Sequence, residues 1–195
     1  MPDRPLRADA LRNRRRLLDT AVRAFSRDGA EVTLESIARD AGVGIGTLYR
    51  HFPSREALIE AAYRNELAKL CDAVPELLAT LPAQAAVRAW MDRFVDYLAA
   101  KQGMADALRL AIASGANPFA RSRDLLHAAL GELLAAGVAA GTVRSDVAPA
   151  DVLAGLSGVC LVAGEPGQRG QAGRLLDLLM DGLRPRPHPA GTSAK

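Results

Sequence analysis

Apolar residues follow a helical spacing along most of the chain. Leu, Ala and Val recur every three or four residues, and the alternation of apolar and polar positions that marks a half-buried strand does not persist. Gly, Pro and capping residues divide this pattern into about nine segments. The sequence therefore predicts an all-α protein, with helices over residues 9–27, 34–41, 45–51, 55–74, 83–102, 104–113, 121–140, 149–163 and 171–183.

Composition narrows the class of protein. With 195 residues, 49% hydrophobic and 24% charged, the chain has the make-up of a globular protein and not of a disordered or collagen-like one. Two cysteines in apolar stretches, Cys71 and Cys160, indicate buried thiols rather than a disulfide framework. The start lacks a secretory apolar segment, and the longest uncharged run, residues 152–164, is shorter than the about 20 residues of a membrane span. We therefore expect a cytoplasmic protein without a membrane partner.

Positive charge is concentrated at the start of the chain. The net charge is +3, and residues 1–64 hold the whole excess. In the first 16 residues only Asp3 and Asp9 oppose the arginines, which are Arg4, Arg7, Arg12, Arg14, Arg15 and Arg16. Such a cationic segment either binds phosphate or is merely solvated.

The segment between Thr33 and Arg55 has the pattern of a helix-turn-helix. Gly42 supplies a positive φ at the turn, and Ala38 is small where two helices approach closely. The apolar residues expected on the inner faces are Ile37, Val43, Leu48 and Phe52. The positions left to face DNA are Gly44, Ile45, Gly46, Thr47, Tyr49, Arg50 and His51.

Residues 33–58, TLESIARDAGVGIGTLYRHFPSREAL, resemble the DNA-binding signature of the TetR family of transcriptional regulators. The resemblance implies that Thr33, Thr47, Tyr49 and His51 hold phosphates, that Arg55 clamps the DNA backbone, and that the helix over residues 45–51 lies in the major groove. It also implies a DNA-binding domain at 9–53 and a helical ligand-binding and dimerisation domain at 54–183. We further expect a flexible basic arm at 1–8 and, because its prolines cannot continue a helix, a disordered tail at 184–195.

Glycines at positions 44 and 46 leave few long side chains to read bases. A glycine inside a helix costs about 1 kcal/mol relative to Ala. We therefore expect specificity to come from Ile45 on a thymine methyl, from Thr47 or Arg50 at base edges, from close approach of the backbone at the glycines, and from DNA shape.

Catalytic and cofactor readings of the same residues find less support. Gly42, Gly44 and Gly46 could suggest a dinucleotide-binding loop, but a helix is predicted before them and Tyr49 stands where that motif needs glycine. The histidines lack metal-ligand spacing to other His, Cys or paired carboxylates. No nucleophile elbow of the form Gly-x-Ser-x-Gly occurs. We expect no enzyme activity, no metal and no cofactor.

Aromatic residues in the C-terminal two thirds either fill a core or line a cavity. In a body like that of the TetR family they imply a pocket for a small hydrophobic or amphipathic effector. The candidate pocket residues are Trp90, Phe94, Tyr97, Met104, Leu108, Phe119 and His127.

The last two predicted helices are apolar around most of their circumference. A surface helix buries one stripe, so the remaining apolar faces are expected to pack against a second copy in a homodimer. Otherwise both helices are central to their own subunit. The candidate interface residues are Val152, Leu156, Val159, Leu175, Leu176, Leu179, Met180 and Leu183.

These features together predict a ligand-responsive transcriptional regulator, a repressor that binds a palindromic double-stranded operator as a homodimer. Two alternatives stay open. One is a DNA-binding regulator without a small-molecule effector, and the other is an all-helical enzyme or scaffold. Steep dependence of DNA binding on salt separates the regulator from the enzyme or scaffold.

Overall fold

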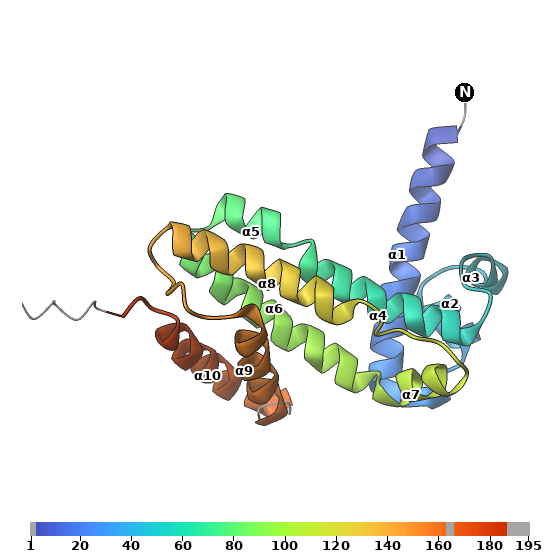
Figure 1. Ribbon diagram of the computed structural model, residues 1–195. Coiled ribbons are helices and arrows are strands. Elements are labelled where there is room, and N and C mark those ends of the chain that lie inside the picture. Colours follow the sequence, from blue (N-terminus) through green and yellow to red (C-terminus); the bar gives the residue numbers. More distant parts are fainter. Residues whose placement is uncertain (1–2, 163–165, 187–195) are drawn as a thin grey trace, which may run out of the picture. The chain divides into compact units, whose positions relative to one another are not determined.

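The computed structural model describes residues 3–162 and 166–186, and within these ranges every regular element is helical (Figure 1). The predicted all-α class is confirmed. The helices are α1 (Asp3–Asp28), α2 (Leu34–Asp40), α3 (Ile45–His51), α4 (Arg55–Cys71), α5 (Val74–Thr80), α6 (Ala83–Gly103), α7 (Ala105–Ala113), α8 (Ser122–Ala139), α9 (Pro149–Val162) and α10 (Arg169–Gly182). Short 3₁₀ turns, η1 (Gly29–Glu31) and η2 (Pro166–Gln168), follow α1 and precede α10.

The chain forms two compact units. Unit 1 comprises Met1–Leu70 and Asp96–Arg123, and unit 2 comprises Cys71–Val95 and Asp124–Lys195. These units are defined by compactness and not by function, so the predicted boundary at residue 54 between a DNA-binding and a ligand-binding domain stays a prediction. None of the helices within the described ranges is long and apolar enough to span a membrane.

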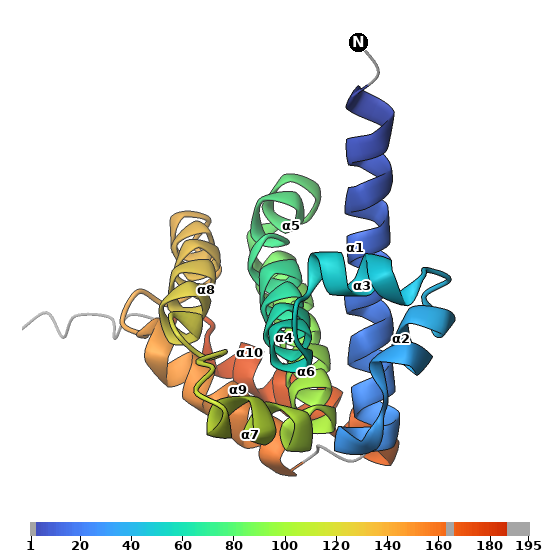
Figure 2. The same cartoon turned by 90° about the vertical axis from the view of Figure 1, so that its right-hand side faces the viewer.

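Unit 1 is built on α1, with α2 and α3 beside it (Figure 2). α1 begins at Asp3, six residues before the predicted start at residue 9. Pro5 lies in its first turn, where the missing N–H breaks no intrahelical hydrogen bond, so the proline does not delay the helix. The buried apolar residues shared by α1, α2, α3 and the start of α4 are Leu17, Leu18, Ala21, Phe25, Ile37, Leu48, Phe52 and Leu58.

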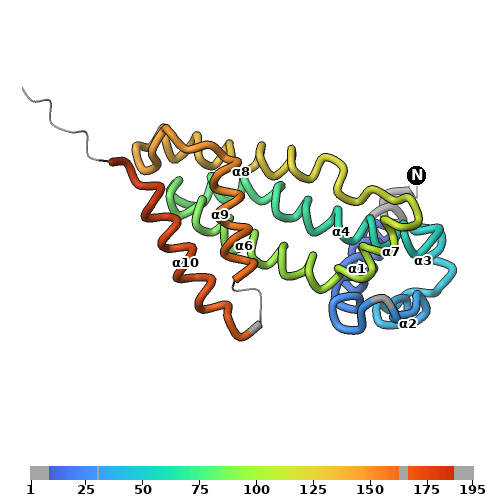
Figure 3. The backbone as a smooth tube through the Cα atoms, turned by 60° about the horizontal axis from the view of Figure 1, so that its bottom comes forward, coloured from blue at the N-terminus to red at the C-terminus, as the bar shows by residue number. Residues whose placement is uncertain are grey.

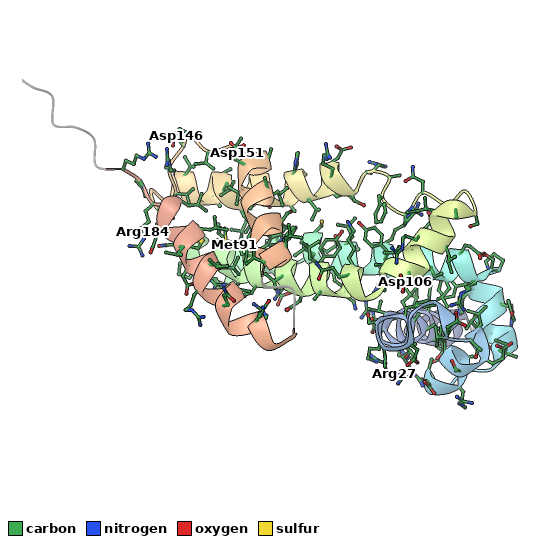
Figure 4. The ribbon with its side chains drawn as sticks, turned by 90° about the horizontal axis from the view of Figure 1, so that it is seen from below. Arg27, Met91, Asp106, Asp146, Asp151 and Arg184 are labelled. Carbon is green, nitrogen blue, oxygen red and sulfur yellow. The ribbon has the colours of Figure 1, made fainter. Side chains whose placement is uncertain are left out.

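The end of α1 lies close to the junction of α6 and α7. A Cβ added to Gly103 would fall 2.6 Å from Ser26 Oγ, and one added to Gly29 would fall 3.8 Å from Asp106 Oδ2. Figure 4 labels Asp106 on α7. The glycine at position 103 is therefore required by close packing.

The helix predicted over residues 55–74 is divided between α4 and α5 in the structure. The apolar spacing predicts a continuous helix over residues 55–74, whereas α4 ends at Cys71 and α5 starts at Val74. A proline ring clashes with the carbonyl four residues earlier, so Pro75 ends the preceding helix at Cys71 and takes the first turn of the next.

Unit 2 has α5, the first part of α6, nearly all of α8, and α9 and α10. Its largest buried side chain is that of Trp90, and Gly141, with φ +68°, ends α8 as predicted. α9 and α10 lie side by side in Figure 3. The Arg144 amide donates to the Leu183 carbonyl over 2.8 Å, which fixes the segment between α8 and α9 to the end of α10. Most of the predicted tail, residues 187–195, lies outside the described residues.

Candidate nucleic-acid interface

Thr33 caps the N-terminus of α2. Its Oγ1 accepts a hydrogen bond from the Ser36 amide at 3.1 Å, and Ser36 Oγ donates to the Thr33 carbonyl at 2.8 Å. Because the capping oxygen acts as an acceptor, its own hydroxyl hydrogen can still donate outward. Thr33 is exposed, so the predicted phosphate contact is compatible with its structural role.

The turn between α2 and α3 closes with glycine in the left-handed region. Gly42 has φ +65°, its amide donates to the Arg39 carbonyl at 2.9 Å, and the Val43 amide donates to the Ala38 carbonyl at 3.0 Å. These bonds satisfy the last carbonyls of α2. The predicted positive φ is confirmed, and Ala38 is buried as expected.

α3 buries one face and leaves the other open. Leu48 is fully buried, whereas Ile45 is 37% and Tyr49 46% exposed. Arg50 is exposed, and its side chain lies along its own helix, where Nε donates to the Gly46 carbonyl at 3.2 Å and Nη2 to Thr47 Oγ1 at 3.4 Å. The outer face of α3 therefore presents a mixed set of groups that can contact DNA.

The two glycines of this face have open space around them. A Cβ built on Gly44 or Gly46 meets no heavy atom within 4 Å among the described residues, and neither glycine has a positive φ. Gly44 is the N-cap of α3, a position where glycine is acceptable. Gly46 lies inside the helix, where nothing in the described fold explains the loss of helix propensity.

Arginines of α1 support the helix-turn-helix from behind. Arg16 Nη2 donates to the Ala41 carbonyl at the end of α2, over 2.5 Å. The Arg14 guanidinium lies 5.1 Å from the ring centroid of Phe52, the residue that ends α3. Arg12 pairs with Asp9. The packing roles of Arg14 and Arg16 do not follow from the sequence, because charge spacing indicates phosphate ligands or solvated groups and does not show how α1 crosses its neighbours.

Arg55 makes a similar internal contact at the start of α4. Its Nη1 donates to the Val32 carbonyl, one residue before the cap at Thr33, and its guanidinium lies 5.2 Å from the centroid of the Phe25 ring. The position is half-buried. Arg55 therefore positions the start of α2, and the implied clamp on the DNA backbone stays a prediction.

The candidate effector residues are divided between the two units. In unit 1, the Tyr97 hydroxyl is 2.7 Å from the Tyr63 hydroxyl, and the Phe119 ring meets Tyr63 edge-to-face with centroids 5.0 Å apart. Tyr63 also donates to Ser122 Oγ at 3.2 Å. Tyr63 and Ser122 are not among the predicted pocket residues, because only the fold brings the middle of α4 to the start of α8. Met104 and Leu108 are buried in the same unit.

Unit 2 holds the other three effector candidates. Trp90 and Phe94 stack with ring centroids 5.7 Å apart, and both are buried. His127 is half-buried on α8. The assignment of all these residues to one pocket stays a prediction.

Most candidate interface residues are buried within unit 2 itself. This holds for Val152, Leu156, Val159, Leu176, Met180 and Leu183. Leu175 and Leu179 are half-buried, and a Cβ on Gly155 of α9 would lie 3.3 Å from Leu179 Cδ2. The open apolar side chains are different ones: Leu161 at 82%, Val162 at 62% and Leu178 at 66% exposure. One stripe of each helix thus serves the unit's own core, and the exposed stripe is shifted from the predicted set.

The thiols are poor redox groups. Burial, together with the nearby Asp72, raises the pKa of the Cys71 thiol to about 11. Burial also raises the pKa of Cys160, although Arg169 opposes the shift. Since the thiolate is the reactive form, both cysteines are expected to react slowly at neutral pH. Within the described ranges, no group of His, Cys, Asp and Glu is placed to hold a metal ion.

α2 is capped by Thr33, Gly42 closes the turn in the left-handed region, and α3 exposes one face. This arrangement is that of a helix-turn-helix DNA-binding protein. The family described as "Bacterial regulatory proteins, tetR family" matches residues 17–62, and "Transcriptional regulator SbtR-like, C-terminal domain" matches residues 82–185. The chain belongs to the TetR family and is a DNA-binding transcriptional regulator, not an enzyme.

Solved relatives extend this match over nearly the whole chain. A TetR transcriptional regulator of Streptomyces coelicolor is 58% identical, with a TM-score of 0.86 over 89% of this chain and 99% of that one. A TetR regulatory protein of Mycobacterium vanbaalenii is 38% identical, with a TM-score of 0.77 over 93% and 100%. An HTH-type transcriptional regulator of Staphylococcus aureus is 41% identical over 63 residues, 32% of this chain and 34% of the relative. The chain thus spans about a third of the length of that curated relative.

Proposed function

We propose that this regulator is a repressor that binds a palindromic operator as a homodimer and releases it when a small effector binds. The observation that carries the proposal is the outer face of α3, where Ile45, Tyr49 and Arg50 are exposed beside two glycines with open space around them. Such a face suits the major groove of DNA, in which side chains and a closely approaching backbone can reach base edges.

The polar groups around α3 divide into two roles. Thr33, Tyr49 and His51 supply donors for phosphate oxygens, which position the protein without reading sequence. The apolar side chain of Ile45 contacts the methyl group of a thymine. Arg50 contacts base edges. To do so, its guanidinium gives up the hydrogen bonds to the Gly46 carbonyl and Thr47 Oγ1 that it makes in the free protein.

The dimer uses the open stripe of α9 and α10. Leu161, Val162 and Leu178 are exposed there, and an open depression of about 450 Å³ on α10 is lined by Leu175 and Leu178 with a rim of Gln171, Arg174, Asp177 and Asp181. An apolar centre with a polar rim is the usual anatomy of a protein interface. A two-fold dimer places two α3 helices on successive major grooves, about 34 to 36 Å apart.

α4 connects effector binding with the DNA-binding helices. Arg55 at its start holds the Val32 carbonyl, and Tyr63, about 12 Å further along the helix, lies in the hydroxyl cluster with Tyr97 and Ser122. An effector that moves Tyr63 shifts α4, and α4 shifts the start of α2. A shift of several ångströms in the spacing of two α3 helices breaks one half-site.

Binding to DNA duplexes tests this function directly. The full chain first selects a preferred sequence from random duplexes. The Arg50→Ala variant is expected to bind this duplex about tenfold or more weakly than the wild-type chain, because each good base contact contributes about 1 to 3 kcal/mol. Arg109→Ala, which removes an exposed arginine of α7, is the matched control and is expected to change affinity little. Equal losses for both variants would contradict the proposed interface.

Effector response is read in the same assay. Ligands that raise the melting temperature of the chain are expected to lower its affinity for the selected duplex, because they bind the DNA-free conformation better. Ligands that stabilise the chain but leave every DNA complex intact would favour a regulator without effector release.

A further inference from the structure

Lys101 on α6 is a half-buried cation without a carboxylate partner among the described residues. Its Nζ lies 4.6 Å from the centroid of the Phe119 ring. Burial lowers the pKa of the ammonium, and no charge on a described residue opposes this shift. A charge removed from water in this way is normally compensated by a counter-ion or by hydrogen bonds.

Lys69 on α4 shows what such compensation looks like in the same unit. Its Nζ lies 2.8 Å from Asp19 Oδ1 and 2.7 Å from Glu66 Oε1. Partial burial opposes the charge of Lys69, but the two carboxylates outweigh it and its pKa is raised. The two lysines therefore differ in one respect that matters for binding: Lys69 already has its anions, and Lys101 has an aromatic ring instead.

The groups around Lys101 suit a ligand with an acid end and an apolar body. Phe119 contacts both Lys101 and Tyr63, so its ring joins the ammonium to the buried hydroxyl cluster of Tyr63, Tyr97 and Ser122. Hydroxyls both donate and accept, so this cluster can exchange one internal bond for a bond to a ligand. Phe119 is 36% exposed, so its ring is open to a ligand, whereas Tyr63, Tyr97 and Ser122 are buried.

We infer that Lys101, Phe119 and Tyr63 form a binding site for a small carboxylic acid with an aromatic or aliphatic body. The carboxylate bonds to Lys101 Nζ, the apolar body lies against the Phe119 ring, and the Tyr63 hydroxyl fixes its orientation. The inference rests on the proposed ligand response, and it assigns the chemical class of the effector.

The test compares acids with amides of the same shape, by calorimetric titration of the full-length chain. The probes are 2-naphthoate with 2-naphthamide, and decanoate with decanamide. In the wild-type chain at least one acid is expected to bind about tenfold to a hundredfold more tightly than its amide, as is usual for a charge-assisted hydrogen bond.

Three variants test whether the preference for the acid over the amide depends on Lys101. Lys101→Met keeps the length of the side chain and is expected to bind acid and amide equally, whereas Lys101→Arg keeps the charge and the preference. Lys69→Met removes the other described lysine of the unit and is expected to keep the wild-type preference. Circular dichroism before titration establishes that each variant is folded.

Two results would overturn the site: an acid preference that survives Lys101→Met, or no saturation by either acid up to its solubility. Failure of the proposed function looks different. A chain that binds an acid through Lys101 but keeps its operator duplex at saturating acid would retain this site and lose the proposed release of DNA.

Discussion

α3 and α10 solve the same structural problem with opposite surface chemistry. Each buries one stripe in its own unit, through Leu48 on α3 and Leu176 on α10. Beyond that stripe α3 exposes Tyr49, Arg50 and two glycines, whereas α10 exposes Leu178 beside half-buried Leu175. In the proposed function the exposed stripe, not the buried one, meets the partner: α3 offers groups for phosphates and bases, and α10 offers an apolar surface for a second copy of the chain.

The two helices also differ in how they are held. α3 is a short helix whose C-cap, Phe52, lies against the Arg14 guanidinium of α1, and Arg16 of α1 holds the Ala41 carbonyl at the end of the preceding helix α2. α10 is held to α6 by Arg88, whose Nε donates to Asp177 Oδ1 at 2.8 Å. Asp177 has two roles, since it binds Arg88 of its own unit and also lies on the rim of the α10 depression. On α3, the exposed Arg50 is bonded only within its own helix, to the Gly46 carbonyl and Thr47 Oγ1.

The largest expected effect is on the apolar stripe. Leu178→Glu leaves the core of unit 2 intact because Leu178 is exposed, but in a two-fold dimer it buries two carboxylates. The dissociation constant of the dimer is expected to rise at least about a hundredfold. Analytical ultracentrifugation measures the change, and Leu110→Glu, at a leucine of α7 that is 54% exposed, is the control. An intact dimer in the Leu178 variant would remove the proposed role of α10.

A smaller effect is expected from the support behind α3. Arg16→Ala removes the hydrogen bond to the Ala41 carbonyl and is expected to lower the free energy of unfolding by about 1 kcal/mol. Arg15→Ala removes the adjacent exposed arginine and is expected to change it by less than about 0.5 kcal/mol. Urea unfolding of both variants measures the difference. Equal values would show that Arg16 belongs with the solvated charges.

The smallest change in stability has the opposite sign. Gly46→Ala adds a methyl group where the protein has open space, so it is expected to stabilise the fold by about 0.5 to 1 kcal/mol. The same methyl group stands between the helix and the DNA, so affinity for the selected duplex is expected to fall. Thermal unfolding and fluorescence anisotropy follow the two quantities. A variant that gains both stability and affinity would contradict close approach of the backbone at this position.

Much of the DNA-binding segment could be predicted from the sequence because its signals are local. The cap at Thr33, the left-handed turn at Gly42 and the buried side chain of Leu48 each follow from residue type and helical spacing. The break after Cys71 was also present in the sequence, since Pro75 fixes it, but the prediction placed the proline after the helix instead of in the first turn of the next.

Contacts between distant segments could not be predicted in this way. Nothing in the spacing of the arginines places Arg16 on the Ala41 carbonyl, and nothing local brings Tyr63 to Tyr97. The same limit applies to α9 and α10. Apolar residues surround both helices in sequence, and only the fold shows that Leu156 and Leu176 serve the unit's own core while Leu178 is open.

Selection of duplexes by the full chain, followed by anisotropy titration at increasing salt, tests the central claim most directly. The account predicts one palindromic sequence with half-sites about 10 base pairs apart, bound with a steep negative dependence on salt that reflects several phosphate contacts. It also predicts that Thr47→Ala and Arg50→Ala change which bases are preferred. Enrichment of no sequence, or unchanged base preference in both variants, would contradict the assignment of the outer face of α3 to DNA.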